Sequence, residues 1–167
     1  MRKAHRGDDL KLVTSLVVDL FDKPWRELSD LIGDKSLSSP GVYILAWSVS
    51  PLAGKKPKPR DVLYVGMSNS AGGVRARLRQ FLGGLEQNNR HSGAKRFFRE
   101  YAHNVPISRY RTKNRFFGTA IALKCDSNKL EAKPTDFRIM GHVACLEYYV
   151  RAHILAETGK RPDLNWR

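Results

Sequence analysis

The sequence has only two cysteines, no long hydrophobic run and, in its middle part, very few acidic residues. Cys125 and Cys145 cannot build a disulfide framework and match no zinc-ligand spacing, so we expect reduced thiols in an intracellular protein. The most apolar early stretch, residues 12–21, is interrupted by Asp19 and is followed by no cleavage site, which favours folded structure over a signal peptide. No run approaches the length of a membrane span, so we expect no membrane partner.

Motifs that mark several common enzyme classes are missing as well. The chain has no Walker loop, no Gly-x-Ser-x-Gly elbow and no paired zinc motif, which argues against P-loop NTPases, α/β-hydrolases and zinc-dependent domains. It has no internal repeat. A length of 167 residues with 41% hydrophobic residues fits one domain with a sizeable core.

The net charge of +14 is concentrated in the middle of the chain. Residues 1–50 hold seven basic and seven acidic residues, residues 51–117 hold fifteen and three, and residues 118–167 hold eight and six. Such an excess repels itself unless a polyanion offsets it, so nucleic acid is the expected partner. A docking surface for an acidic protein is the alternative that composition leaves open. An acidic membrane is disfavoured because no long basic amphipathic helix with an exposed apolar face is evident.

Two β-rich runs, residues 41–49 and 61–67, are separated by a long basic loop and predict a β-hairpin. The first opens with Gly-Val-Tyr and the second contains Tyr-Val-Gly, so the hairpin places Tyr43 and Tyr64 on neighbouring strands. Gly41 and Gly66 beside them leave room for another backbone or a ligand to approach closely.

Helical periodicity follows the hairpin. It predicts a basic helix over residues 73–85, a second helix over 93–103 and a long helix over 140–158, with a buried strand at 116–124. Residues 1–39 are expected to be an N-terminal extension with one or two helices, one of them starting at Pro24. The expected fold is α/β, with a small three-stranded mixed or antiparallel sheet flanked by helices over residues 40–167.

Glu147 shares the face of the long helix that carries Val143, Val150 and Ile154 and should point to the core. A buried glutamate needs a partner. A salt bridge to Arg151, one turn later, is one explanation, and a bound cation is the other. Mg²⁺ suits a single carboxylate because it keeps several waters and takes its remaining ligands from substrate phosphates.

In their order along the chain these features resemble the GIY-YIG nuclease family, whose members cut phosphodiester bonds in DNA. The resemblance covers roughly residues 40–167. It is carried by the two tripeptides, the basic helix, Glu147 and a closing Pro-Asp-Leu-Asn at residues 162–165. It implies a metal-dependent endonuclease that holds one Mg²⁺ or Mn²⁺ through Glu147 and acts on DNA, most simply double-stranded DNA.

The resemblance also implies a role for each site residue. Tyr43 would be the general base for the attacking water, and Tyr64 would contact the scissile phosphate or its water network. A phenol is a poor base at neutral pH, so a metal or an arginine must assist it, and water activated by the metal is an equal alternative. Arg77 takes the position of the family arginine, which grips phosphate oxygens. Asn165 matches the terminal asparagine, which lies near the phosphate or orders the glutamate.

Two departures from the family pattern affect these expectations. Phe81 stands where the family usually has a histidine, four residues after the arginine, and the connection from Tyr64 to the basic helix is longer than usual. His91, in Arg-His-Ser-Gly at residues 90–93, is a candidate to supply the imidazole. The departures leave open a catalytically impaired nucleic-acid-binding protein that retains the fold.

Basic side chains outside the catalytic set are the expected contacts to the DNA backbone. These are Arg75, Arg79, Lys95, Arg96, Arg99, Lys55 and Lys56. We expect a cytoplasmic or nucleoid-associated protein that acts alone or as a homodimer.

Overall fold

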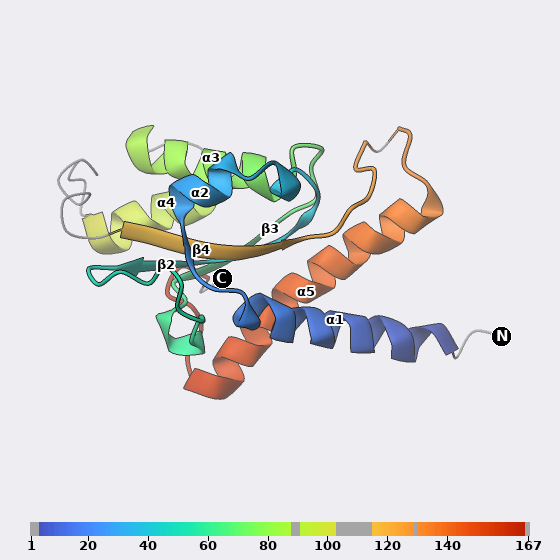
Figure 1. Ribbon diagram of the computed structural model, residues 1–167, viewed down its shortest axis with the longest axis horizontal. Coiled ribbons are helices and arrows are strands. Elements are labelled where there is room, and N and C mark those ends of the chain that lie inside the picture. Colours follow the sequence, from blue (N-terminus) through green and yellow to red (C-terminus); the bar gives the residue numbers. More distant parts are fainter. Residues whose placement is uncertain (1–3, 88–90, 103–114, 129, 166–167) are drawn as a thin grey trace.

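The structure is a computed structural model that describes residues 4–87, 91–102, 115–128 and 130–165. Its centre is an antiparallel sheet with the strand order β1-β4-β2-β3 (Figure 1). The strands are β1 (Arg26–Glu27), β2 (Gly41–Ser48), β3 (Tyr64–Ser68) and β4 (Arg115–Ala122). β2 pairs with β3 from Gly41↔Ser68 to Leu45↔Tyr64 and with β4 along its whole length. The predicted hairpin of β2 and β3 is therefore present.

The α/β class is confirmed, but the described residues form four strands where three were expected, and every pairing is antiparallel. The additional strand is β1, at a place where we predicted a helix that starts at Pro24. Trp25 donates its backbone N–H to the Lys55 carbonyl at 2.8 Å, and the next two residues pair with β4. These long-range hydrogen bonds outweigh the local helical preference, and α2 (Leu28–Gly33) begins only after them.

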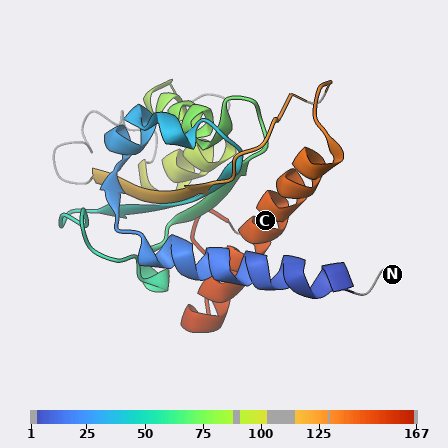
Figure 2. The ribbon, with the colours of Figure 1, turned by 45° about the vertical axis from the view of Figure 1, so that its right-hand side comes forward.

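Helices cover both faces of the sheet (Figures 1 and 2). α2, α3 (Gly73–Gln87) and α4 (Ser92–Phe97) lie on one face, and α1 (Ala4–Asp22) and α5 (Pro134–Thr158) lie on the other. β2 alternates between the two cores: Tyr43 and Leu45 enter the first, while Val42 and Ile44 enter the second. Burial on both faces explains why this strand is an almost continuous apolar run.

The predicted helices are present, but several of them begin or end at other residues than predicted. The apolar stripe of α3 is buried as predicted, through Val74, Leu78, Phe81 and Leu85. The helix predicted over residues 93–103 is α4 followed by a π-helical turn at Phe98–Ala102, and residue 103 lies outside the described residues. Short 3-10 turns occupy Lys35–Leu37 and Pro59–Asp61.

α5 begins at Pro134, earlier than the predicted start at residue 140. Proline suits the first turn of a helix, and the Asp136 carboxylate accepts the backbone N–H of Lys133 at 2.8 Å, which together extend the helix towards its N-terminus. The helix ends at Thr158, as predicted, and Gly159 caps it with φ of 70°, the left-handed conformation that favours glycine.

α1 belongs to the same core as the rest of the fold. Its apolar side chains Val13, Leu16 and Leu20 pack in one cluster with residues of α5. At the far end of α1, Asp9 accepts a 2.6 Å hydrogen bond from Arg138. Among the described residues, no helix has both the length and the apolar character needed to cross a membrane.

Candidate active site

One cavity collects most of the predicted catalytic side chains. It has a volume of about 270 Å³ and lies where β3, α3, α4, α5 and the C-terminal segment meet. Four residues predicted for the site, Tyr64, Arg77, Glu147 and Asn165, line this space. The other lining residues are Met67, Ser92, Arg96 and Arg151.

Glu147 is half-buried on α5 at the edge of this cavity. Burial raises the pKa of its carboxyl group, and the positive charges of Arg151 and Arg77 oppose that rise only in part. The Arg151 guanidinium, the salt-bridge partner considered above, donates a hydrogen bond to the Asn165 carbonyl at 3.1 Å. The carboxylate is available as a cation ligand, but the arginines that line the same cavity oppose a cation that enters without an anion.

The donor set of the cavity fits some metals and not others. Within the described part of the chain, no group of three or more His, Cys, Asp or Glu side chains could hold a metal ion. A zinc or calcium site would need such a group. A single carboxylate fits Mg²⁺ or Mn²⁺, which complete their coordination with water and phosphate oxygens. Glu147 is the residue that would hold the ion.

Arg77 is the electrostatic centre of the site. Its positive charge favours the deprotonated forms of Tyr43, Tyr64, His91 and Glu147, and so contributes to lowering the pKa of all four groups. Its guanidinium donates a hydrogen bond to the Gln80 side-chain oxygen at 3.0 Å. The charge of Arg77 thus lowers the pKa of each tyrosine, histidine and glutamate side chain that was predicted for catalysis.

The two tyrosines differ in their access to the cavity. Tyr64 lines it, whereas Tyr43 is fully buried behind it, with the two ring centroids 6.1 Å apart. Burial raises the pKa of both phenols, and it raises that of Tyr43 well above the ordinary value near 10. Both phenols are therefore protonated at neutral pH. Tyr43 can serve as the implied general base only if additional positive charge lowers its pKa and so offsets the effect of burial.

The glycines beside the tyrosines are sites of close approach. A Cβ atom at Gly66 would lie 2.5 Å from the Tyr43 hydroxyl oxygen and 2.8 Å from Cε1 of Tyr64. A Cβ atom at Gly41 would overlap the carbonyl oxygen of Ile121 in β4. In both cases the approaching group belongs to the protein itself, so these two glycines position the phenols and the strand pairing.

His91 lies outside the cavity lining, only 1% exposed, and forms the N-cap of α4. Its Nδ1 accepts the backbone N–H groups of Gly93 at 3.1 Å and Ala94 at 3.4 Å. An accepting Nδ1 places the proton of the neutral ring on Nε2, which lies 3.5 Å from the Tyr43 hydroxyl and donates to it. Burial, together with the charge of Arg77, lowers the pKa of His91 to about 4, so the ring is neutral at pH 7.

Phe81, the residue that replaces the family histidine, is the neighbour of this imidazole. The His91 ring packs edge-on against Phe81 with 5.2 Å between centroids, and Phe81 stacks on Tyr64 at 6.0 Å. An imidazole is therefore present beside the tyrosines, from a different chain segment. It reaches Tyr43 rather than the cavity.

Asn165 closes the free edge of β3. Its Oδ1 accepts the Val65 N–H at 2.6 Å and its Nδ2 donates to the Val65 carbonyl at 2.8 Å. Leu164 adds a hydrogen bond from its N–H to the Leu63 carbonyl at 3.1 Å. The carboxamide thus imitates a paired strand residue, and it holds β3 in place beside Tyr64.

The same C-terminal segment anchors two arginines of the cavity. Arg96 donates to the Leu164 carbonyl and Arg151 donates to the Asn165 carbonyl. Arg96 was predicted as a contact to the DNA backbone, while Arg151 was not predicted as a site residue. Its position four residues after Glu147 on one helix is the sequence signal that could have identified it. Ser92, which also lines the cavity, has no comparable signal.

The remaining basic residues predicted to contact DNA are spread over the surface. Arg79, Lys95 and Lys55 are exposed. Three others bind protein groups: Arg75 donates to the Ile32 carbonyl at 2.8 Å, Lys56 pairs with Asp22 at 2.6 Å, and Arg99 pairs with Glu100 at 2.9 Å. Residues 103–114, which belong to the basic part of the chain at residues 51–117, lie outside the described residues.

Comparisons of this chain with protein-family models, with curated proteins and with solved structures find no match.

Proposed function

We propose that the protein is a metal-dependent DNA endonuclease that hydrolyses phosphodiester bonds in the cavity lined by Tyr64, Arg77 and Glu147. The observation that carries this proposal is that three distant parts of the sequence, a strand, a basic helix and a late helix, bring these side chains to one space of about 270 Å³. Such hydrolysis requires cationic groups that bind the phosphate, a ligand for the metal ion and hydroxyl groups that donate hydrogen bonds.

The arginines bind the scissile phosphate. Arg77, Arg96 and Arg151 line the same cavity, and a guanidinium can contact two phosphate oxygens at once. In the reaction a water oxygen forms a bond to phosphorus, the bond from phosphorus to the leaving sugar oxygen breaks, and that oxygen takes up a proton. The negative charge that grows on the other phosphate oxygens is stabilised by the fixed guanidinium groups.

Glu147 holds the divalent cation in this proposal. A bound Mg²⁺ or Mn²⁺ supplies positive charge that lowers the pKa of water and of neighbouring phenols and offsets the charge of the phosphate. Tyr64 donates a hydrogen bond to the phosphate or to the attacking water. Tyr43, whose hydroxyl is hydrogen-bonded by His91, supports Tyr64 from behind or accepts the proton of the water.

The proposal is tested by incubating the purified protein with supercoiled plasmid and Mg²⁺ or Mn²⁺. Glu147→Gln should reduce cleavage at least about a hundredfold, because the loss of a cation ligand removes several kcal/mol of transition-state stabilisation. The matched control is Glu157→Gln, an exposed glutamate on the same helix, which should cut like the wild type. Unchanged cleavage by the Glu147 variant would contradict the proposal.

DNA binding in EDTA separates a role in catalysis from a role in binding. Glu147→Gln removes a negative charge from a cavity meant for phosphate, so metal-free binding should be as tight as in the wild type or tighter. Weaker binding by this variant would point to a structural role for Glu147.

The second candidate function is a DNA-binding protein without catalysis. It is favoured by Phe81, a fully buried ring at the position where the family has a polar histidine. Gel shifts that show DNA binding, together with plasmid that stays supercoiled in both metals, would establish it. Negligible affinity for DNA, with no steep salt dependence, would instead favour an acidic protein partner.

A further inference from the structure

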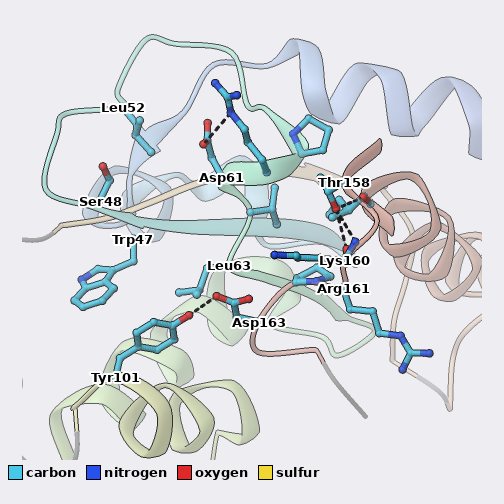
Figure 3. Close-up of a pocket in the computed structure, with 15 residues that line it drawn as sticks. Trp47, Ser48, Leu52, Asp61, Leu63, Tyr101, Thr158, Lys160, Arg161 and Asp163 are labelled. Carbon is cyan, nitrogen blue, oxygen red and sulfur yellow. Dashed lines mark hydrogen bonds and ion pairs between the residues drawn. The ribbon is translucent and has the colours of Figure 1, made fainter. Parts of the chain in front are cut away.

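A second and larger cavity, shown in Figure 3, is lined in part by residues next in sequence to those of the candidate active site. Its volume is about 550 Å³, within the range of small-molecule sites. The loop between β2 and β3 contributes Leu52, Pro59 and Arg60, and the segment after α5 contributes Lys160, Arg161 and Asp163. The cavity is therefore built largely by the loop between β2 and β3 and by the segment that leads to Asn165.

The two cavities share one wall. Leu63 and Asp163 line the larger cavity, while Tyr64 and Asn165 line the smaller one. The segments that carry these residues are joined by the hydrogen bond from the Leu164 N–H to the Leu63 carbonyl. A polymer whose phosphate occupies the smaller cavity can therefore extend over this wall into the larger one.

The larger cavity has an aromatic end and a cationic end. Figure 3 shows Trp47 and Tyr101 at one end and Thr158 and Lys160 at the other. The ring centroids of Trp47 and Tyr101 are 5.4 Å apart, and Trp47 also packs edge-on against Phe97 at 4.9 Å. The aromatic end is thus fixed in position before any ligand enters.

The acidic residues of this cavity are already engaged. Asp163 accepts the hydroxyl of Tyr101, and Asp61 lies 3.9 Å from the Arg60 guanidinium. No carboxylate among the described residues lies within ion-pair distance of the Lys160 ammonium group. Lys160 is therefore available to meet an anionic ligand, as is Arg161, which lines the same cavity.

We propose that the larger cavity is a second nucleic-acid subsite, which takes one unpaired nucleotide of the strand whose phosphate lies in the candidate active site. The base stacks at the Trp47 and Tyr101 end, and Lys160 binds its phosphate. Aromatic platforms combined with cations are the usual means of holding single-stranded nucleic acid. A base inside a duplex has both faces covered by its neighbours, so only an unpaired base can use the platform. This inference rests on the proposed function.

The test compares two DNA ligands by fluorescence anisotropy in EDTA, so that it does not depend on cleavage. One is a blunt duplex, and the other is the same duplex with a short single-stranded overhang at either end. The wild type should bind the overhang DNA at least about fivefold more tightly, the effect of one stacked base. Lys160→Gln should remove this preference and reduce the salt slope for overhang DNA by about one.

The matched control is Lys133→Gln, the same change at the other end of α5. Lys133 is exposed and lies a whole helix away, so this variant should keep the overhang preference. A fluorescent base analogue in the overhang provides a second readout, because stacking on an aromatic ring should quench its emission at one position. Equal binding of the two ligands by the wild type, or equal effects of the two lysine variants, would overturn the subsite.

The possible failures are distinguishable. Absence of any DNA binding would defeat the proposed function together with the subsite. Cleavage of plasmid combined with no overhang preference would defeat the subsite alone. Binding of a free nucleoside monophosphate that depends on Lys160 and is undiminished by saturating overhang DNA would overturn the assignment to a strand, in favour of a free nucleotide.

Discussion

Replacing His91 by asparagine should change how the stability of the protein depends on pH. The wild-type imidazole is buried and its pKa is lowered to about 4, from an ordinary value near 6.5. Between about pH 6.5 and 4, His91 is therefore protonated in the unfolded chain and neutral in the folded chain. The contribution of His91 to folding is present above pH 6.5 and is lost as the pH falls towards 4. Asparagine removes the titrating ring but keeps a side-chain oxygen that can cap α4.

The size of this effect follows from the pKa difference. One bound proton in the unfolded state and none in the folded state give a slope of about 1.4 kcal/mol per pH unit. Over the interval from pH 6.5 to 4 the wild type should lose about 3 kcal/mol of unfolding free energy through His91 alone. The pKa of Glu147 is raised in the folded protein, so its protonation changes the unfolding free energy in the opposite direction. This contribution is the same in the wild type and in His91→Asn.

Urea denaturation between pH 7.5 and 4.5 measures the difference. His91→Asn should be less stable than the wild type at pH 7.5, because it leaves part of the ring's space empty and removes the donor to Tyr43. The two stabilities should converge on acidification, since only the wild type carries the additional slope. Parallel curves over this range would refute the reasoning, because they would show that His91 ionises as freely in the folded chain as in the unfolded one.

Two further substitutions test the geometry around β3. Gly66→Ala places a Cβ atom 2.5 Å from the Tyr43 hydroxyl, so it should destabilise the fold by about 1–3 kcal/mol and lower any nuclease activity, measured by urea denaturation and plasmid cleavage. Gly83→Ala on α3 meets nothing within 4 Å and, as the control, should leave activity unchanged and stabilise slightly. Asn165→Leu leaves both backbone groups of Val65 without their partner and should cost about 1–3 kcal/mol in the same denaturation assay, where no loss would contradict the proposed edge closure.

Much of the fold was predictable because its signals are local. The stripe of α3 and the hairpin of β2 and β3 follow from the spacing of apolar residues, and Gly159 ends α5 as a left-handed glycine. β1 was not predictable in this way, since its existence depends on hydrogen bonds to Lys55 and to β4, which are distant in the sequence. The start of α5 at Pro134 was missed because its first turns carry few buried side chains.

The candidate site was predictable as a set of residues but not as an arrangement. Glu147 could be identified because a carboxylate on an apolar helix face needs a partner. The engagement of Asn165 with Val65, and the separation of Tyr43 from the cavity, depend on distances that spacing does not encode. The role of His91 as a cap and as a donor to Tyr43 likewise appears only when α4 is placed against β2.

The charges around the cavity favour phosphate over a free cation in the resting protein. Arg77, Arg96 and Arg151 line it together with the single carboxylate of Glu147, so its formal charge is positive. Two of these arginines are fixed by carbonyl groups of the C-terminal segment, which makes their charge a permanent feature of the site. An anion entering this space is stabilised by groups that need no rearrangement, whereas a cation meets three like charges. In the proposed function, the phosphate of the substrate would therefore add to the affinity for a divalent ion at Glu147, and we expect substrate and ion to bind cooperatively.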